Sequence, residues 1–231
     1  MTHVPVRRVR DGQESLVIAG LLAIASGFLD ALTYLDHGGV FANAMTGNII
    51  LAGVSAAATH WGDTVGHLLP VAAFVVGGLV GECLMLPAAR RFVPWPSAST
   101  LGLEIVFLGI VAGLPRAFTS SWLALGISFV AAIQSTSFRR VGGQSYSTIV
   151  TTNNLRSFVG HAFAAIREPD SRNRRLTLWF GLVCLSFLAG AAIGALCTMW
   201  IGDRALWIAA GILLAAWILL VTDLLLARKK R

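Results

Sequence analysis

The stretch SGFLDALTYLDHGGVFANAMTGN, residues Ser26 to Asn48, decides the fold because the same order of groups recurs in the second half of the chain. The second copy, residues Ala131 to Asn153, reads AAIQSTSFRRVGGQSYSTIVTTN. Each copy closes an apolar segment, passes a Gly-Gly pair and an aromatic residue, and then opens a new segment with Thr and Asn. An internal duplication in a membrane protein commonly places a solute site where the two halves meet.

The composition is that of a membrane protein. Hydrophobic residues make up 56% of the 231 residues and charged residues 13%, whereas soluble domains carry roughly a quarter charged residues. The net charge of +7 would suggest nucleic-acid binding in a soluble protein, but here the basic residues flank apolar segments and orient the chain in a bilayer. We therefore expect an integral membrane protein that contacts the lipid bilayer and binds no nucleic acid.

Six segments are predicted to span the membrane, since a crossing needs about 20 residues for roughly 30 Å of hydrocarbon. They run near Leu16–Leu35, His67–Ala89, Thr100–Leu114, Trp122–Phe138, Leu176–Met199 and Ala205–Leu226. Two shorter apolar segments, Thr46–His60 and Thr151–Ile166, follow directly on the repeated motif. If neither crosses, every lysine and arginine except Arg116 and Arg204 lies on the cytoplasmic side with both termini. The positive-inside rule thus favours six spans over eight.

This topology predicts an inverted repeat. Each half holds an odd number of spans, so the second copy, about residues 120–226, enters the membrane from the face opposite to the first, about residues 15–115. The expected fold is an all-α polytopic bundle, with six transmembrane helices and two short helices, forming a single membrane domain over residues 1–231. The expected location is a bacterial inner membrane, and a homodimer is compatible with a bundle of this size.

The two short helices admit two interpretations. Thr46 or Asn48, and Thr151 or Asn153, are good N-cap residues. Two helix starts that re-enter to mid-depth from opposite faces would form a polar pocket suited to an anion or a carbonyl-bearing solute. Alternatively, both helices lie flat in the interface as capped amphipathic helices.

Acidic residues lie within the predicted spans. A carboxylate at the bilayer centre costs about 2.5–3.5 kcal/mol, so Asp30 is expected to face protein or water. It either binds a proton or cation coupled to transport, or holds the neighbouring motif loop by hydrogen bonds. Gln134 is assigned the matching place in the second half. Glu82 and Glu104 are expected to snorkel at the inner interface, with an arginine partner or a place along the solute path as the alternatives.

Small residues predict close helix packing at two places. Gly77, Gly78 and Gly81 lie in the second span, and Gly190 and Gly194 form a GxxxG pair in the fifth. The sequence holds no HExxH, GxSxG or Walker motif and no set of Cys and His with metal-ligand spacing. We therefore predict no catalytic residue, cofactor or metal, and do not expect an enzyme.

The block Gly27-Phe28-Leu29-Asp30-Ala31, with Tyr34, Phe41 and Met45-Thr46-Gly47-Asn48, resembles the YoaK family. Gln134, Arg139 and Thr151 in the second half agree with it, and the resemblance extends from about Ser15 to Leu226. It implies a small bacterial membrane protein with about six spans and brings no established reaction or substrate. In one departure, Thr152 stands where family members often carry Gly.

The expected function is that of a small secondary transporter or channel-like permease for a small polar solute, with a preference for an anion. The alternative is a membrane scaffold, assembly factor or sensor that moves no solute, whose basic tail and inner arginines bind anionic lipid or an acidic partner. The residues expected to form the solute site are Asp30, Thr46, Gly47, Asn48, Gln134, Thr151, Thr152 and Asn153.

Overall fold

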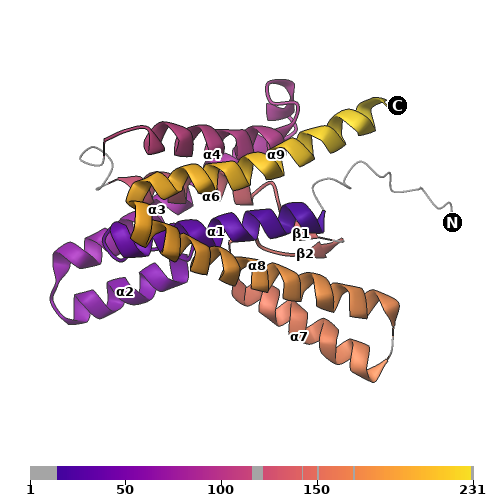
Figure 1. Cartoon of the computed structure of the whole chain (residues 1–231), viewed down its shortest axis with the longest axis horizontal. Helices are drawn as coiled ribbons and strands as arrows, with labels where there is room; N and C mark the ends of the chain where they lie inside the picture. Colours follow the sequence, from indigo (N-terminus) through magenta and orange to yellow (C-terminus); the bar gives the residue numbers. More distant parts are fainter. Residues whose placement is uncertain (1–14, 116–121, 142, 150, 169, 230–231) are drawn as a thin grey trace.

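The computed structural model of the chain describes residues 15–115, 122–141, 143–149, 151–168 and 170–229. The elements, in order, are α1 (Leu16–Asp36), α2 (Met45–Ala57), α3 (Trp61–Met85), the 3-10 helix η1 (Ala89–Arg91), α4 (Pro96–Ala112), α6 (Leu123–Ser135), β1 (Arg140–Val141), β2 (Gln144–Ser145), α7 (Thr151–Arg167), α8 (Ser171–Ile201), the 3-10 helix η2 (Gly202–Ala205) and α9 (Leu206–Lys229) (Figure 1). The arginines expected near the amino terminus, Arg116 and the last two residues lie outside the described residues.

An apolar helix stands at each predicted span, namely α1, α3, α4, α6, α8 and α9. Three helical segments are long and apolar enough to cross a membrane by length and composition: Leu16–Asp36, Trp61–Met85 and Ser171–Lys229, the last of which joins α8 to α9 through η2. The helices α4 and α6 are apolar but shorter. The chain is therefore an all-α membrane protein.

Besides α4, which begins at Pro96 rather than near Thr100, two helices begin earlier than the hydropathy pattern predicts. Only Ala58–His60 separates α2 from α3, which begins at Trp61. The helix α8 begins at Ser171, where the carboxylate of Asp170 accepts a hydrogen bond from the Arg172 N–H at 3.1 Å and caps the helix. Polar first turns hid both starts, because hydropathy marks only the apolar part of a helix.

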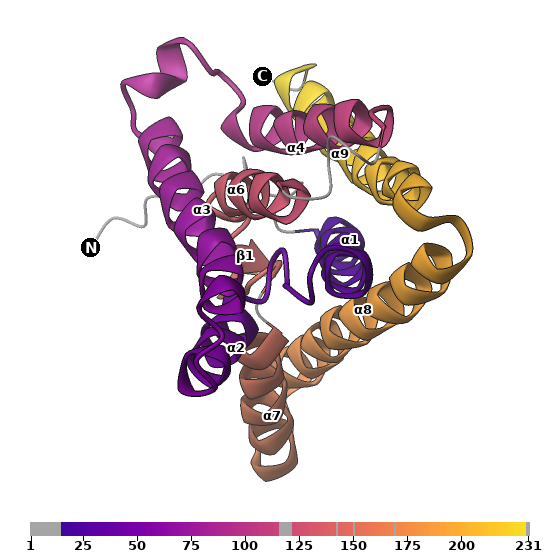
Figure 2. The same ribbon diagram turned by 90° about the vertical axis from the view of Figure 1, so that its left-hand side faces the viewer.

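The halves of the chain are packed in a reciprocal way (Figure 2). The helices α1 and α6 lie at the centre of the bundle. The helix α1 packs mainly against α8, and α6 against α3; α2 lies along α3, and α7 along α8. The contact of α1 with α9 is matched by that of α6 with α4. These main packing contacts are thus retained when α1, α2, α3 and α4 are exchanged for α6, α7, α8 and α9.

The helices α1 and α8 approach each other at glycines. A Cβ atom added to Gly190 would collide with the backbone carbonyl of Ile24, and one added to Gly194 would lie 2.6 Å from the Phe28 backbone. Both glycines are buried. Van der Waals packing of two backbones is the main attraction available between helices in lipid, so these glycines stabilise the crossing.

The helices α3 and α6 also approach each other at glycines. A Cβ atom added to Gly77 would collide with the backbone carbonyl of Phe129, and one added to Gly81 would lie 3.1 Å from the Cα of Ile133. The close packing predicted for Gly77 and Gly81 is confirmed, whereas that predicted for Gly78 is wrong, because a Cβ atom added there meets nothing within 4 Å. The two crossings define counterparts in the two halves: Gly77 with Gly190, Gly81 with Gly194, Phe129 with Ile24, and Ile133 with Phe28.

The helix ends gather at two ends of the long axis. In Figure 1 the start of α1, the α7–α8 turn and the end of α9 lie toward the right, and the α2–α3 turn and η2 lie toward the left. The helices α2 and α7 both begin near the middle of this axis and run toward opposite ends.

A short hairpin occupies the second Gly-Gly motif. Strands β1 and β2 pair antiparallel with Arg140 opposite Ser145 and Val141 opposite Gln144. Gly143 has a φ of 80° in the turn, a conformation that favours glycine. The prediction of a helix-only chain did not include this hairpin, because two-residue strands leave no periodic pattern in the sequence.

Candidate functional site

Asp30 holds the first motif loop. Its side chain is 4% exposed, and its Oδ1 accepts a hydrogen bond from the Asn43 N–H at 2.6 Å. One turn later on α1, the Thr33 hydroxyl accepts a hydrogen bond from the Ala42 N–H at 3.1 Å. Of the two roles considered for Asp30, these contacts favour the one in which it fixes the loop.

Asn43 adds a polar group to the same buried place. Its amide nitrogen donates a hydrogen bond to the Ser26 carbonyl at 3.2 Å. Its Oδ1, and the Oδ2 of Asp30, are buried and have no hydrogen-bond partner among the described residues. The Ser128 hydroxyl on α6 donates to the Ala42 carbonyl at 2.7 Å, so the loop also bridges to the second half.

Asn48 closes the loop from the other side. Its Oδ1 accepts a hydrogen bond from the Phe41 N–H at 2.8 Å, and its amide nitrogen donates to the Phe41 carbonyl at 2.7 Å. Asn48 is fully buried. The N-cap role expected for Thr46 or Asn48 is wrong, because α2 begins at Met45 with Ala44 as the N-cap residue and no side-chain cap.

Asn154 does in the second motif what Asn48 does in the first. Its Oδ1 accepts a hydrogen bond from the Ser147 N–H at 3.1 Å, and its amide nitrogen donates to the Ser147 carbonyl at 2.7 Å. It is 3% exposed, whereas its neighbour Asn153 is exposed. The counterpart of Asn48 is therefore Asn154, one residue later than the sequence alignment placed it. The adjacent asparagines made the register ambiguous.

The structure disperses the predicted site residues. Thr46, Thr152 and Asn153 are exposed, and Thr151 is half-buried. The site residues that it brings together, Asp30 and Asn48, are both bound to the first motif loop. A Cβ atom added to Gly47 would lie 2.7 Å from the Phe41 ring, so Gly47 makes room for that ring.

Gln134 is buried at the end of α6. The glycine contacts pair Phe28 with Ile133, so the counterpart of Asp30 two residues later is Ser135 rather than Gln134. The Ser135 hydroxyl donates to the Ala132 carbonyl at 2.9 Å within its own helix. The second half therefore has no carboxylate at the place of Asp30.

A cavity of about 600 Å³ lies beside the first motif loop. Its wall is made by the loop, by one face of α2 and α3, and by the start of α6; the lining residues are Tyr34, His37, Gly38, Gly39, Val40, Leu51, Gly62, Asp63, Gly66, His67, Leu69, Pro70, Ala124 and Leu125. None of the predicted site residues lines it. The structure therefore moves the candidate site from the helix starts to the space next to the loop they support.

Polar groups of the cavity wall come from α1 and α3. The Nδ1 atom of His67 is buried and has no hydrogen-bond partner among the described residues. The carboxylate of Asp63 is 3.9 Å from the His60 ring. Gly38 and Gly39 have φ values of 80° and 67°, a backbone conformation that favours glycine. The first Gly-Gly pair is therefore part of the cavity wall.

His37, in the cavity wall, contacts η2, the short helix between α8 and α9. Its side chain is 1% exposed, and its Nε2 lies 2.8 Å from Oδ1 of Asp203 in η2. Neither residue is among those predicted from the sequence. The two residues are 166 positions apart in the chain, so no local pattern marks the pair.

A smaller cavity of about 330 Å³ lies at the second motif. It is lined by Ser145, Tyr146, Asn153, Arg156 and Ser157. Asn153 is thus a predicted site residue that does line a cavity, but the cavity belongs to the second half alone.

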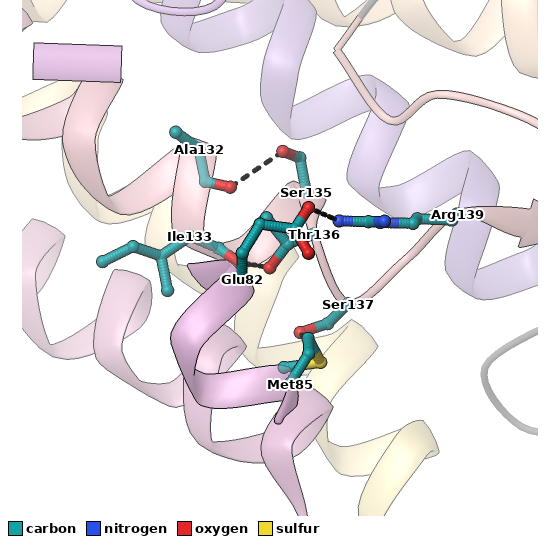
Figure 3. A network of polar contacts seen from close by, with 8 residues as sticks. All are labelled: Glu82, Met85, Ala132, Ile133, Ser135, Thr136, Ser137 and Arg139. Carbon is teal, nitrogen blue, oxygen red and sulfur yellow. Dashed lines mark hydrogen bonds and ion pairs between the residues drawn. The ribbon is translucent and has the colours of Figure 1, made fainter. Parts of the chain in front are cut away.

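The glutamates in the spans do not behave alike. Glu82 on α3 forms an ion pair with Arg139, which follows α6, beside the hydroxyl groups of Ser135 and Thr136 (Figure 3). This is the arginine partnership considered as an alternative to snorkelling. Snorkelling is wrong for Glu104, because its side chain is 4% exposed in the core and its Oε2 has no hydrogen-bond partner among the described residues.

The described residues contain no group of three or more His, Cys, Asp or Glu side chains placed to hold a metal ion. Cys83, Cys184 and Cys197 are free thiols.

The comparisons with known proteins agree on a family. Residues 18–219 match the family described as "Protein of unknown function (DUF1275)". The chain is 30% identical over 188 residues to the UPF0700 transmembrane protein YoaK of Bacillus subtilis (strain 168), an alignment that covers 78% of this chain and 82% of that protein. No solved structure matches. The chain therefore belongs to the DUF1275 family and is similar to YoaK, as the resemblance in the first motif predicted.

Proposed function

We propose that this protein is a small permease that passes a small polar solute through the bundle, with the cavity beside the first motif loop as its solute site. The observation that carries the proposal is this cavity of about 600 Å³, walled by glycines and by His67, whose Nδ1 has no hydrogen-bond partner among the described residues. Ligand sites are concave and combine an apolar wall with few polar groups. The cavity also touches both halves of the chain, since Ala124 and Leu125 come from α6.

The proposed topology is an inverted repeat with six spans. The reciprocal packing of α1 with α8 and of α6 with α3 supports it. So does the placement of the helix ends, because the start of α1, the α7–α8 turn and the end of α9 share one end of the molecule. This end carries Arg172, Arg174 and Arg175, in keeping with a cytoplasmic face. We place both termini in the cytoplasm of a bacterium.

The short helices are proposed to re-enter the membrane rather than to lie flat. Each forms an antiparallel hairpin with a long apolar helix, α2 with α3 and α7 with α8. A helix that packs along a spanning helix runs across the bilayer with it. Their lengths of 13 and 17 residues are the same as those of α6 and α4, so the proposal that α2 and α7 do not cross completely rests on the positive-inside rule.

The solute is proposed to be neutral or cationic. The expected preference for an anion rested on two facing helix starts, but α2 and α7 are not among the helix pairs that pack extensively in the described part of the chain. The cavity wall carries the carboxylate of Asp63, and a carboxylate repels anions. The proposed roles are therefore lining for His67 and Asp63, and support of the loop for Asp30 and Asn48.

Flux measurements test this proposal. Purified protein in liposomes is expected to move at least one member of a panel that includes urea, glycerol, ammonium, sodium, chloride and phosphate. His67→Ala should lower the rate at least tenfold, because it removes the unpartnered polar group of the cavity wall. Val65→Ala, on the exposed face of the same helix, is the matched control and should keep the rate.

The absence of flux for every member of the panel, from protein that remains folded, would refute the permease. Chloride or phosphate flux without ammonium, sodium or neutral-solute flux would refute the proposed charge preference alone.

Labelling tests the topology. A cysteine placed at Gly62 is expected to react with a membrane-impermeant maleimide from the outside only, and one placed at Glu168 from the cytoplasm only. Gly62 follows the α2–α3 turn and Glu168 lies in the α7–α8 turn, which lie at opposite ends of the bundle. Reaction of both from one side would exclude the inverted repeat.

A second candidate function is a scaffold that binds anionic lipid and moves no solute. The helix α7 favours it, because an exposed apolar face lies beside exposed arginines; the apolar residues are Leu155, Val159, Phe163 and Ile166. Such a face suits the membrane interface. Co-purification of anionic lipid that survives Asn48→Ala, together with zero flux, would select this function.

A further inference from the structure

The counterparts defined by the glycine contacts show that the two halves differ at the cavity. Since Gly77 pairs with Gly190 and Gly81 with Gly194, the α3 residues of the cavity wall can be matched to residues of α8. His67 then corresponds to Phe180. A polar side chain on an open cavity is replaced by a large apolar one.

The other walls follow the same pattern. Pro70 on α3 corresponds to Val183 on α8, and Ala124 on α6 to Ala19 on α1. Pro70 and Ala124 line the open cavity. Their counterparts belong instead to a closed apolar cluster of buried residues; its members are Ala19, Ala23, Val141, Tyr146, Phe180 and Val183.

Tyr146 occupies in the second half the position that Val40 of the first motif loop occupies at the open cavity. Asn48 binds Phe41 as Asn154 binds Ser147, so Tyr146, just before Ser147, matches Val40, just before Phe41. Val40 lines the open cavity. Tyr146 is 6% exposed in the apolar cluster, and a larger side chain thus fills the equivalent space.

A side chain from α7 packs against this apolar cluster. The ring of His161 stacks on Phe180 with 5.7 Å between the ring centroids and an interplanar angle of 14°. The Nδ1 of His161 lies 3.1 Å from Oδ1 of Asn173, in the first turn of α8. Phe180 is fully buried between the His161 ring and α1.

We propose that this cluster, the Phe180 plug, is the closed gate of the solute pathway on the face opposite to the open cavity. The structure is then the state open toward the α2–α3 turn. The inference rests on the proposed permease function. In an inverted repeat, one half opens as the other closes around a shared site, and a pathway open at one end only is what such a cycle requires. The small cavity lined by Tyr146 and Arg156 lies on the cytoplasmic side of this gate.

Cysteine accessibility tests the gate without knowledge of the solute. In protein whose Cys83, Cys184 and Cys197 are replaced by Ser, single cysteines at Gly66 and Val183 report on the open and the closed side. Gly66 is exposed and has no atoms near an added Cβ, whereas Val183 is 1% exposed. With a hydrophilic maleimide on detergent-solubilised protein, Gly66→Cys should react at least a hundredfold faster than Val183→Cys.

Removing the plug should then expose the closed side. Phe180→Ala is expected to raise the reaction rate of Val183→Cys at least tenfold, and Tyr146→Ala provides a second variant should Phe180→Ala fail to fold. Phe138→Ala is the matched control, because Phe138 is equally buried but belongs to the other core cluster. It should leave the rate unchanged.

Equal rates for Gly66→Cys and Val183→Cys in the starting protein would overturn the gate, and so would an increase with Phe138→Ala as large as with Phe180→Ala. The labelling result and the flux result are separate. A protein that shows the expected labelling but moves no solute would refute the permease, and one that moves solute with an unprotected Val183→Cys would refute only the gate.

Discussion

Asn154→Ala is expected to destabilise the protein about as strongly as Asn48→Ala, whereas Asn153→Ala should change its stability little. Asn48 and Asn154 each satisfy both the N–H and the carbonyl of one loop residue. Removing the amide leaves these backbone groups unsatisfied, at a cost of about 1–3 kcal/mol for each buried group. The exposed Asn153 makes no comparable contact with the part of the chain that the structure describes, and surface substitutions usually stay within about 0.5 kcal/mol.

The measurement is the unfolding midpoint of the detergent-solubilised variants, with flux as a second readout for Asn48→Ala. A loosened first motif loop is expected to abolish flux, since the loop is a wall of the cavity. If Asn153→Ala lowered the stability strongly and Asn154→Ala lowered it little, Asn153 rather than Asn154 would be the counterpart of Asn48.

Gly77→Ala is expected to be the most damaging single-methyl change on α3, and Gly78→Ala one of the mildest. A Cβ atom at Gly77 would meet the carbonyl oxygen of Phe129, a backbone atom that cannot move aside, whereas one at Gly78 meets open space. Overpacking of this kind costs about 1–3 kcal/mol or more, while Gly to Ala in an open helical position gains up to about 1 kcal/mol.

Gly190→Ala repeats the test at the reciprocal crossing, because its Cβ would meet the carbonyl of Ile24. Expression level and the unfolding midpoint measure the outcome, and the adjacent glycine Gly78 is the control. If Gly77→Ala and Gly78→Ala behaved alike, close contact at Gly77 would not be what holds α3 to α6.

The helices and the family could be predicted from the sequence. Apolar length marked α1 and α9 within a few residues, because the bilayer imposes that length. The glycine spacings predicted where backbones approach, since a residue without a Cβ atom allows the closest approach. The same reasoning could not choose between Gly77 and Gly78, which depends on which face of α3 meets α6.

The candidate site was less predictable. Thr46 and Asn48 were selected for their N-cap chemistry, yet Asn48 binds a loop residue seven positions earlier. The cavity itself, with His67 and the His37–Asp203 pair, is formed by tertiary contacts that leave no local pattern. The motif was a sound guide to the neighbourhood of the site, because Asp30 and Asn48 build the loop that forms one of its walls.

The reciprocal crossing also determines how the chain can be divided. The central helix of each half finds its main partner in the other half, α1 in α8 and α6 in α3. A fragment ending after α4 would leave α1 without the surface that buries it, and a fragment beginning at α6 would lack α3. Each piece is therefore expected to fold only when the other is made with it, because each supplies the surface that buries the central helix of the other.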